Sequence, residues 1–288
     1  MTGDPNELAP HTEANLDVVE DHPSDMVAPL DEIRELISTN EGRLGEVYRL
    51  TERGLTPEQI ATELNVATVG FVYAYRYYTQ AALIGKPTTG SALRRQTVSA
   101  LNSLLRRGRG VLSPEALAVL QANKAAVEAA GADVDPTAEA KADIEDKYAA
   151  VNTLNALNRV AGIYAFSYGW YLESPVDAER GNTLIKVGLA ADVAERIRSY
   201  ASGVRTHMPE PLVLIRVYPT DDRNLAETEK TFHELLDTAG HANPRRSGTS
   251  KREVGKEWFL TNEDFLDSIA KALKLSTRYI GRSEFAGD

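Results

Sequence analysis

The hydrophobic period of this chain changes near residue 161, and this change constrains the fold more than any other feature. Before it, apolar residues recur at helical spacing, as in residues 44–50. After it, residues 161–168, 184–189 and 212–218 alternate and are rich in β-branched and aromatic side chains. We expect an α+β protein, with an N-terminal all-α region followed by a small antiparallel three-stranded sheet flanked by helices.

The chain is long enough for two modest domains, and its composition divides it further. Residues 1–30 are acidic and rich in Pro, Asn and Asp, so we predict a disordered arm. Residues 31–135 are expected to form a helical domain and residues 136–160 a helical connector. Residues 161–288 would form the sheet domain, which we expect to fold without the helical part.

The charge of the chain is unevenly distributed. The net charge is −10, yet residues 64–114 hold seven basic side chains and no acid. A phosphate backbone responds to the field within about 8 Å rather than to the total charge. This stretch is therefore either a DNA surface or a solvated basic face. A second basic segment precedes Glu257. The predicted DNA contacts are Arg76, Arg94, Arg95, Arg106, Arg107, Arg245, Arg246, Lys251 and Arg252.

Residues 55–78 have the layout of a helix-turn-helix. Thr56 caps a short helix with Gln59 three residues on, and the turn 65–67 leads to a longer helix that carries Arg76. Tyrosine and arginine can reach phosphates or base edges from a helix that lies in a groove. The alternative is that the tyrosines of this helix, at 73, 75, 77 and 78, pack in the core.

Composition also excludes several classes of protein. The chain has no cysteine, and so neither disulfides nor thiolate metal sites. No apolar run approaches the length of a membrane span, and the N-terminus has no secretion signal. We therefore expect no membrane partner and a cytoplasmic location.

Two tripeptides suggest a nuclease. Gly162-Ile163-Tyr164 opens the first strand, and Tyr279-Ile280-Gly281 lies near the C-terminus. The second strand offers a nearer partner in Lys186-Val187-Gly188, so the C-terminal tripeptide is interpreted as a decoy. On these residues, 162–260 resembles the GIY-YIG nuclease family, in the branch whose second tripeptide reads Lys-Ile-Gly or similar.

The resemblance continues in order along the chain. Arg196 and Tyr200 follow on the next helix, Glu229 and His233 lie on a later one, and Glu257-Trp258-Phe259 comes last. It implies a metal-dependent DNA endonuclease with one Mg²⁺ or Mn²⁺ at Glu229 and with Tyr164 as the base, and by analogy a setting in restriction or anti-phage defence. The implied catalytic set is Tyr164, Lys186, Arg196, Tyr200, Glu229 and His233, with Gly162, Gly188 and Glu257 as structural motif residues.

The residues themselves agree with phosphodiester chemistry. Period-2 alternation places Tyr164 and Lys186 on one face, where either could abstract a proton if its pKa were lowered. Arg196 could grip phosphate oxygens. Glu229 lies at the edge of an apolar helical stripe, where a divalent cation would offset the cost of burying a carboxylate. For Glu257 a functional and a structural role stay equally open.

Two other functions remain open from the sequence. One is a DNA-binding regulator with a catalytically silent nuclease fold, because Lys186 replaces the tyrosine of the second tripeptide. The other is a structure-selective or RNA-directed nuclease. A palindromic target would imply a homodimer or two sequential nicks, since one active site cuts one strand at a time.

Overall fold

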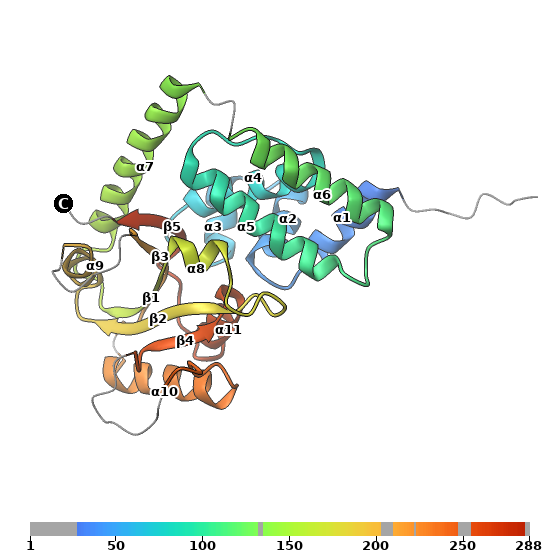
Figure 1. Cartoon of the computed structure of the whole chain (residues 1–288). Helices are drawn as coiled ribbons and strands as arrows, with labels where there is room; N and C mark the ends of the chain where they lie inside the picture. The colour runs from blue at the N-terminus through green and yellow to red at the C-terminus, as the bar shows by residue number, and fades with distance from the viewer. Residues whose placement is uncertain (1–27, 132–134, 203–209, 222, 247–254, 286–288) are drawn as a thin grey trace, which may run out of the picture.

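The computed structural model describes residues 28–131, 135–202, 210–221, 223–246 and 255–285. Within these ranges a helical region comes first and a sheet domain follows (Figure 1). The helical region comprises α1 (Pro29–Ser38), α2 (Arg43–Glu52), α3 (Pro57–Glu63), α4 (Gly70–Ile84), α5 (Ser91–Gly108), α6 (Pro114–Ala129) and α7 (Pro136–Ala156). The sheet domain comprises β1 (Gly162–Tyr168), α8 (Gly169–Glu173), β2 (Thr183–Ala190), α9 (Val193–Ala201), β3 (Leu212–Pro219), α10 (Leu225–Thr238), β4 (Trp258–Thr261), α11 (Glu263–Ala272) and β5 (Tyr279–Phe285).

Polar side chains cap several helices, and the cap predicted at Thr56 is confirmed. Thr56 and Gln59 form the full capping box of α3. Ser113 accepts a hydrogen bond from the Ala116 N–H at the start of α6, and Asp192 accepts one from the Glu195 N–H at the start of α9. The predicted arm falls on residues 1–27, outside the described ranges, and Pro29 already belongs to α1.

The sheet is antiparallel, as predicted, but the expected number of strands is wrong. Within the described residues it has five strands in the order β4-β2-β1-β3-β5, not three. β4 has only four residues, and β5 reads YIGRSEF, with two charges in its outer half. Both are edge strands, where short length and polar side chains are common. Neither therefore shows the alternation that marked the three central strands.

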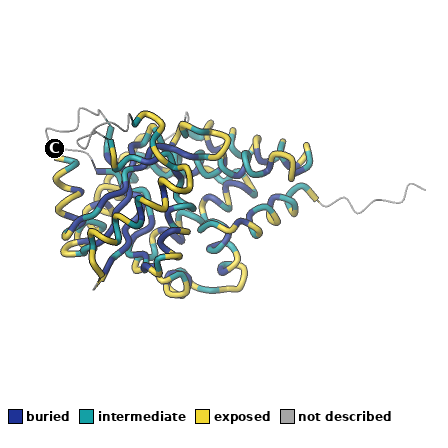
Figure 2. Tube along the Cα trace, turned by 90° about the horizontal axis from the view of Figure 1, so that it is seen from below, coloured by how far each residue is buried: buried dark blue, intermediate teal, exposed yellow. Residues whose placement is uncertain are grey.

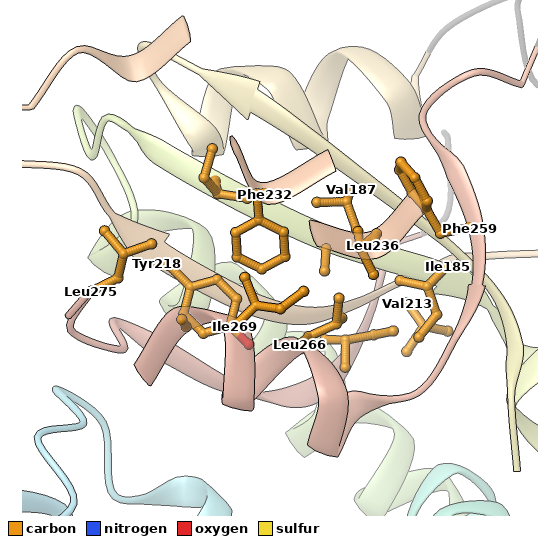
Figure 3. Close-up of a cluster of buried hydrophobic side chains, with 14 of the residues drawn as sticks. Ile185, Val187, Val213, Tyr218, Phe232, Leu236, Phe259, Leu266, Ile269 and Leu275 are labelled. Atoms are coloured by element: carbon orange, nitrogen blue, oxygen red, sulfur yellow. The ribbon is translucent and has the colours of Figure 1, made fainter. Parts of the chain in front are cut away.

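Alternate residues of the central strands pack on opposite faces of the sheet. One face carries Ile163, Ile185 and Val187, which pack against Phe232 and Leu236 of α10 and against α11 (Figure 3). The other face carries Tyr164 and Phe166 and packs against α9 and α7. Buried positions run along the strands, and exposed ones lie on the outer sides of the helices (Figure 2).

The helix-turn-helix layout places α4 inside the helical region rather than on its surface. Phe71, Val72 and Tyr78 are buried, and α4 packs against α1, α2, α3, α5 and α6. Burial raises the pKa of Tyr78 to about 12. Tyr73 and Tyr77 are exposed. The helical nature of this region is confirmed, but these contacts are those of a core helix, and a DNA-reading helix is not shown.

The helical region and the sheet domain share a buried polar interface. Arg216 of β3 is 1% exposed and donates hydrogen bonds to Asp267 of α11, and it also pairs with Glu263 at 3.2 Å. From the helical side, Arg43 lies 3.5 Å from Asp267. Ile280 of β5 belongs to the same apolar cluster as residues of α2, α3 and α4.

The segment predicted as a connector is a single helix that packs against the sheet domain. α7 contacts β5 and α5, and its Ala150 is buried. The N-terminal part of α7 extends away from β5 (Figure 1). Its service as a connector between independent domains stays a prediction.

Candidate active site

The pairing of β1, β2 and β4 brings candidate site residues from different strands side by side. Phe166 pairs with Lys186, and Lys186 pairs with Trp258, so these three residues form one row across β1, β2 and β4. In the next row Tyr164 pairs with Gly188. A Cβ added to Gly188 would lie 2.7 Å from the Tyr164 hydroxyl oxygen. The missing side chain at Gly188 therefore leaves the room in which the Tyr164 hydroxyl sits.

Two tyrosines and two basic side chains lie together beside Gly188. Tyr164 is 2% exposed, and its hydroxyl lies 3.4 Å from the hydroxyl of Tyr200 on α9. The Lys186 ammonium lies 5.4 Å from the centre of the Tyr200 ring, and the Arg196 guanidinium lies 5.9 Å from it. Burial, followed by the hydrogen bond to Tyr200, raises the pKa of Tyr164. The phenol therefore stays protonated at neutral pH unless a cation is added beside it.

Glu229 reaches the same edge of β2 from α10. The backbone N–H of Leu189 donates a hydrogen bond to its carboxylate. Burial raises the pKa of Glu229, and the nearby Glu257 raises it further, while His233 and Lys186 act in the opposite direction. A cation bound to this carboxylate would stabilise its ionised form.

His233 joins α10 to β2. Its Nε2 lies 2.9 Å from the Val187 carbonyl oxygen, which can only accept, so Nε2–H is the donor. Its ring packs on Phe259 with centroids 4.9 Å apart. The Glu229 carboxylate lies one helical turn away, 4.0 Å from Nε2. These contacts attach the Glu229 segment of α10 to β2, and a catalytic role for His233 stays a prediction.

Glu257, the residue before β4, interacts with several of the candidate site residues. It forms a close ion pair with Lys186 and acts electrostatically on both Tyr164 and Glu229. The Glu257 carbonyl oxygen also accepts a hydrogen bond from the Val187 N–H. Glu257 therefore has both structural and electrostatic contacts, and a functional role for it stays a prediction.

The donor set is compatible with a cation that keeps most of its waters. Among the described residues no group of three or more His, Cys, Asp and Glu side chains is arranged to hold a metal. Zinc needs such a group. Mg²⁺ is bound through one or two carboxylates together with waters and substrate phosphates. Glu229, which is partly buried and repelled by Glu257, provides one such carboxylate.

Most of the arginines predicted to bind DNA have partners within the chain. Arg76 donates to the Leu55 carbonyl oxygen, and Arg94 pairs with Glu139. Arg95 pairs with Glu173 and Glu284, and Arg107 pairs with Asp264, so both join α5 to the sheet domain.

The remaining predicted DNA contacts differ in their surroundings. Arg106 donates to the Ser103 hydroxyl, and burial lowers its pKa. Arg246 pairs with Asp237, whereas Arg245 is exposed. Lys251 and Arg252 lie outside the described residues. DNA contact by any of these side chains stays a prediction.

Three further residues have defined positions in the sheet domain. Asn262 caps α11 by accepting from the Phe265 N–H and donates to Asn182. Tyr279 lies on β5 in the same cross-strand row as Tyr164, and Val217 of β3 lies between them. Gly162 packs against the Tyr218 carbonyl oxygen, which a Cβ there would approach to 2.4 Å.

Sequence reasoning missed the side chain of Trp258. The sequence points to it only as the middle residue of Glu257-Trp258-Phe259. In the structure it lies beside Lys186 and packs on Phe166 and Tyr168. A tryptophan directly after a charged residue, at the start of a short strand, is the signal that could have drawn attention to it.

Comparison with known families corrects the predicted family. Residues 163–274 match the model of the T5orf172 domain, which is associated with nuclease-like and DNA-binding phage-related proteins. No GIY-YIG model matches, so the resemblance to that family is wrong. The tripeptides are short, and glycines and aromatics of this kind occur in many antiparallel strands. The match covers less than half of the chain. No curated protein and no solved structure matches it.

Among the described residues, no helix combines the length and the hydropathy that a membrane span requires.

Proposed function

We propose that the sheet domain is a metal-dependent DNA endonuclease that hydrolyses phosphodiester bonds at the site between Tyr164 and Glu229. The observation that carries this proposal is the convergence of two tyrosines, two cations and two carboxylates from five segments on one edge of β2. The T5orf172 match supports a nuclease-like activity in general terms.

The charges of the site favour a phosphate together with a divalent cation. Lys186 and Arg196 balance Glu229 and Glu257, so the side chains alone are close to neutral. One Mg²⁺ or Mn²⁺ at Glu229 would supply the excess positive charge that a transferring phosphate needs and a coordinated water. Glu229 would be its ligand, and His233 would hold that carboxylate in place.

The remaining side chains would bind and orient the phosphate. The exposed guanidinium of Arg196 can donate two hydrogen bonds to non-bridging oxygens. Lys186, fixed by Glu257, offers a second positive charge. The Tyr164 hydroxyl can position the attacking water by a hydrogen bond. It would act as a base only beside a bound cation, because burial keeps the phenol protonated otherwise.

Cleavage of supercoiled plasmid tests this proposal. The wild-type chain should nick the plasmid with Mg²⁺ or Mn²⁺ and not with EDTA. Glu229→Gln should reduce the rate at least about 100-fold, because it removes the proposed metal ligand while keeping the side-chain shape. Arg196→Ala should also reduce the rate.

The matched control is Glu227→Gln, an exposed carboxylate two residues earlier on α10. It should leave the rate unchanged. Equal rates for Glu229→Gln and the wild type would refute the assignment. Absence of metal-dependent cleavage with every DNA form, single-stranded, duplex and branched, would refute the DNA endonuclease and leave the silent DNA-binding protein and the RNA-directed nuclease as alternatives.

A further inference from the structure

Three helices pack on the sheet face that carries the candidate active site, and α7 lies over its β5 edge. α8 follows the end of β1 and α9 follows the end of β2. Because Gly162 pairs with Ala190, these two strands run in opposite directions, and the two helices lie at opposite ends of the pair (Figure 1). Between them the face is occupied by aromatic side chains from three strands and from the last turn of α9.

These aromatic rings support one another. Phe166 is 1% exposed and contacts the rings of Tyr200 and Trp258, at centroid distances of 5.2 Å and 5.7 Å. Trp258 also stacks on Tyr168 at 5.8 Å with an interplanar angle of 18°. Trp258 itself is partly exposed. A buried base of rings therefore holds an indole in a fixed orientation at the surface.

The position of Trp258 relative to the candidate active site is set by strand register. Trp258 is the direct cross-strand partner of Lys186. Adjacent strands lie about 4.8 Å apart, so the indole is one strand spacing from the residue proposed to hold the phosphate. That separation is within the span of a single nucleotide.

We propose that Trp258 is a stacking site for an unpaired nucleobase next to the scissile phosphate. This inference rests on the proposed function, and it names the substrate class as DNA with an unpaired nucleotide at the cleavage site. Bases within a duplex already stack on their neighbours, so only a single-stranded, looped or extruded base can lie on the indole. Stacking on an aromatic ring tolerates any base, because every base has a π-face.

The second tryptophan of the chain provides an internal control. Trp170 on α8 is 64% exposed and stacks on Tyr171. Its backbone N–H donates to the Glu210 carboxylate at 2.8 Å, and Glu173 lies on the same short helix. Glu173 and Lys186 are each offset by an ion-pair partner, but the Glu210 carboxylate beside Trp170 repels phosphate, whereas Arg196 beside the aromatic row attracts it.

Intrinsic fluorescence can test this inference because the chain has only two tryptophans. Trp170→Phe leaves Trp258 as the only emitter, and Trp258→Phe leaves Trp170. Each protein is titrated in EDTA with a short oligothymidylate and with the corresponding duplex. We expect the single strand to quench Trp258 emission and to leave Trp170 emission unchanged.

Affinity measurements on substituted chains complete the test. Trp258→Leu should weaken single-strand binding about five- to 100-fold, the effect of losing one base–aromatic stack, and leave duplex binding unchanged. Trp258→Phe, which keeps a ring, should remain within about threefold of the wild type. Trp170→Leu should bind both DNAs like the wild type. Circular dichroism verifies the fold of each variant.

Two results would overturn the inference: Trp258→Leu binding the single strand like the wild type, or losing single-strand and duplex binding equally. The proposed hydrolysis can fail separately. If Trp258 is quenched selectively but no DNA form is cut with Mg²⁺ or Mn²⁺, the stacking site stands and the nuclease proposal falls. If DNA is cut and Trp258→Leu has no effect on binding, the nuclease proposal stands and the stacking site falls.

Discussion

Replacing Gly188 with alanine should disturb the candidate active site directly. The added Cβ would lie 2.7 Å from the Tyr164 hydroxyl oxygen and 2.9 Å from its Cζ, both well inside van der Waals contact. The ring cannot move away easily, because it is 2% exposed and stacks on Phe166 at 6.0 Å with an interplanar angle of 7°. Overpacking of this kind costs about 1–3 kcal/mol. For a chain of this size that corresponds to a fall in Tm of roughly 2–12 °C.

The Tyr164 hydroxyl oxygen should account for part of the cost of Gly188→Ala. Tyr164→Phe removes the oxygen nearest to the new Cβ and leaves the contact with Cζ. The cost of Gly188→Ala should therefore fall by at least about 0.5 kcal/mol in the Tyr164→Phe background, which is a coupling that a double-mutant cycle resolves.

Thermal unfolding by circular dichroism measures all four proteins of the cycle. Gly70→Ala is the control, because no atom lies within 4 Å of a Cβ added there and Gly70 is exposed at the start of α4. It should be neutral or stabilising by up to about 1 kcal/mol. Equal stability of Gly188→Ala and the wild type, or the same cost in both backgrounds, would show that the Tyr164 hydroxyl does not lie over Gly188.

Three further predictions concern stability. Arg216→Met should destabilise the chain by about 3–5 kcal/mol in chemical denaturation, because it removes the buried cation that Asp267 and Glu263 share, whereas Lys230→Met in an exposed pair should cost at most about 1 kcal/mol. Contrary to the expectation from the sequence, deleting residues 1–157 should abolish the cooperative thermal transition, because it exposes the Ile280 cluster and the Arg216 interface; a sharp transition would support the independent folding expected from the sequence. In EDTA, Glu229→Gln should be more stable than the wild type at alkaline pH, since a raised carboxyl pKa means that ionisation opposes folding. This difference should shrink as the pH falls and vanish below the unfolded value of 4.5; a difference that grows in acid would contradict the sign.

Local patterns in the sequence predicted the parts of the fold that depend on local chemistry. Alternation located β1, β2 and β3, and the capping pattern of Thr56 and Gln59 located the start of α3. Alternation also placed Tyr164 and Lys186 on one face, which is the face they share.

Features that depend on distant contacts could not be read from local patterns. β5 has little apolar alternation, and it becomes a strand because Ile280 and Tyr279 find apolar partners on the helical region and the sheet. Arg216 reads as a solvated charge within an apolar strand, and only its contacts with α11 explain its burial. The partners of the α5 arginines were likewise hidden, since Glu284 lies almost 190 residues from Arg95.

The tripeptides led to the wrong family for a different reason. The first two tripeptides lie on predicted strands, β1 and β2, but they did not identify the family, because glycine and aromatic residues at these positions satisfy backbone and packing needs that many sheets share. Strand register, and not the tripeptides, brings Lys186, Gly188 and Trp258 to the same place.

Binding of Mn²⁺ measured by electron paramagnetic resonance tests the central claim most directly. With a hydrolysis-resistant phosphorothioate DNA present, the wild-type chain and Glu227→Gln should each bind a single Mn²⁺. Glu229→Gln should lose it while still binding the DNA. Undiminished Mn²⁺ binding by Glu229→Gln would contradict the assignment of the metal to this carboxylate, and with it the proposed active site.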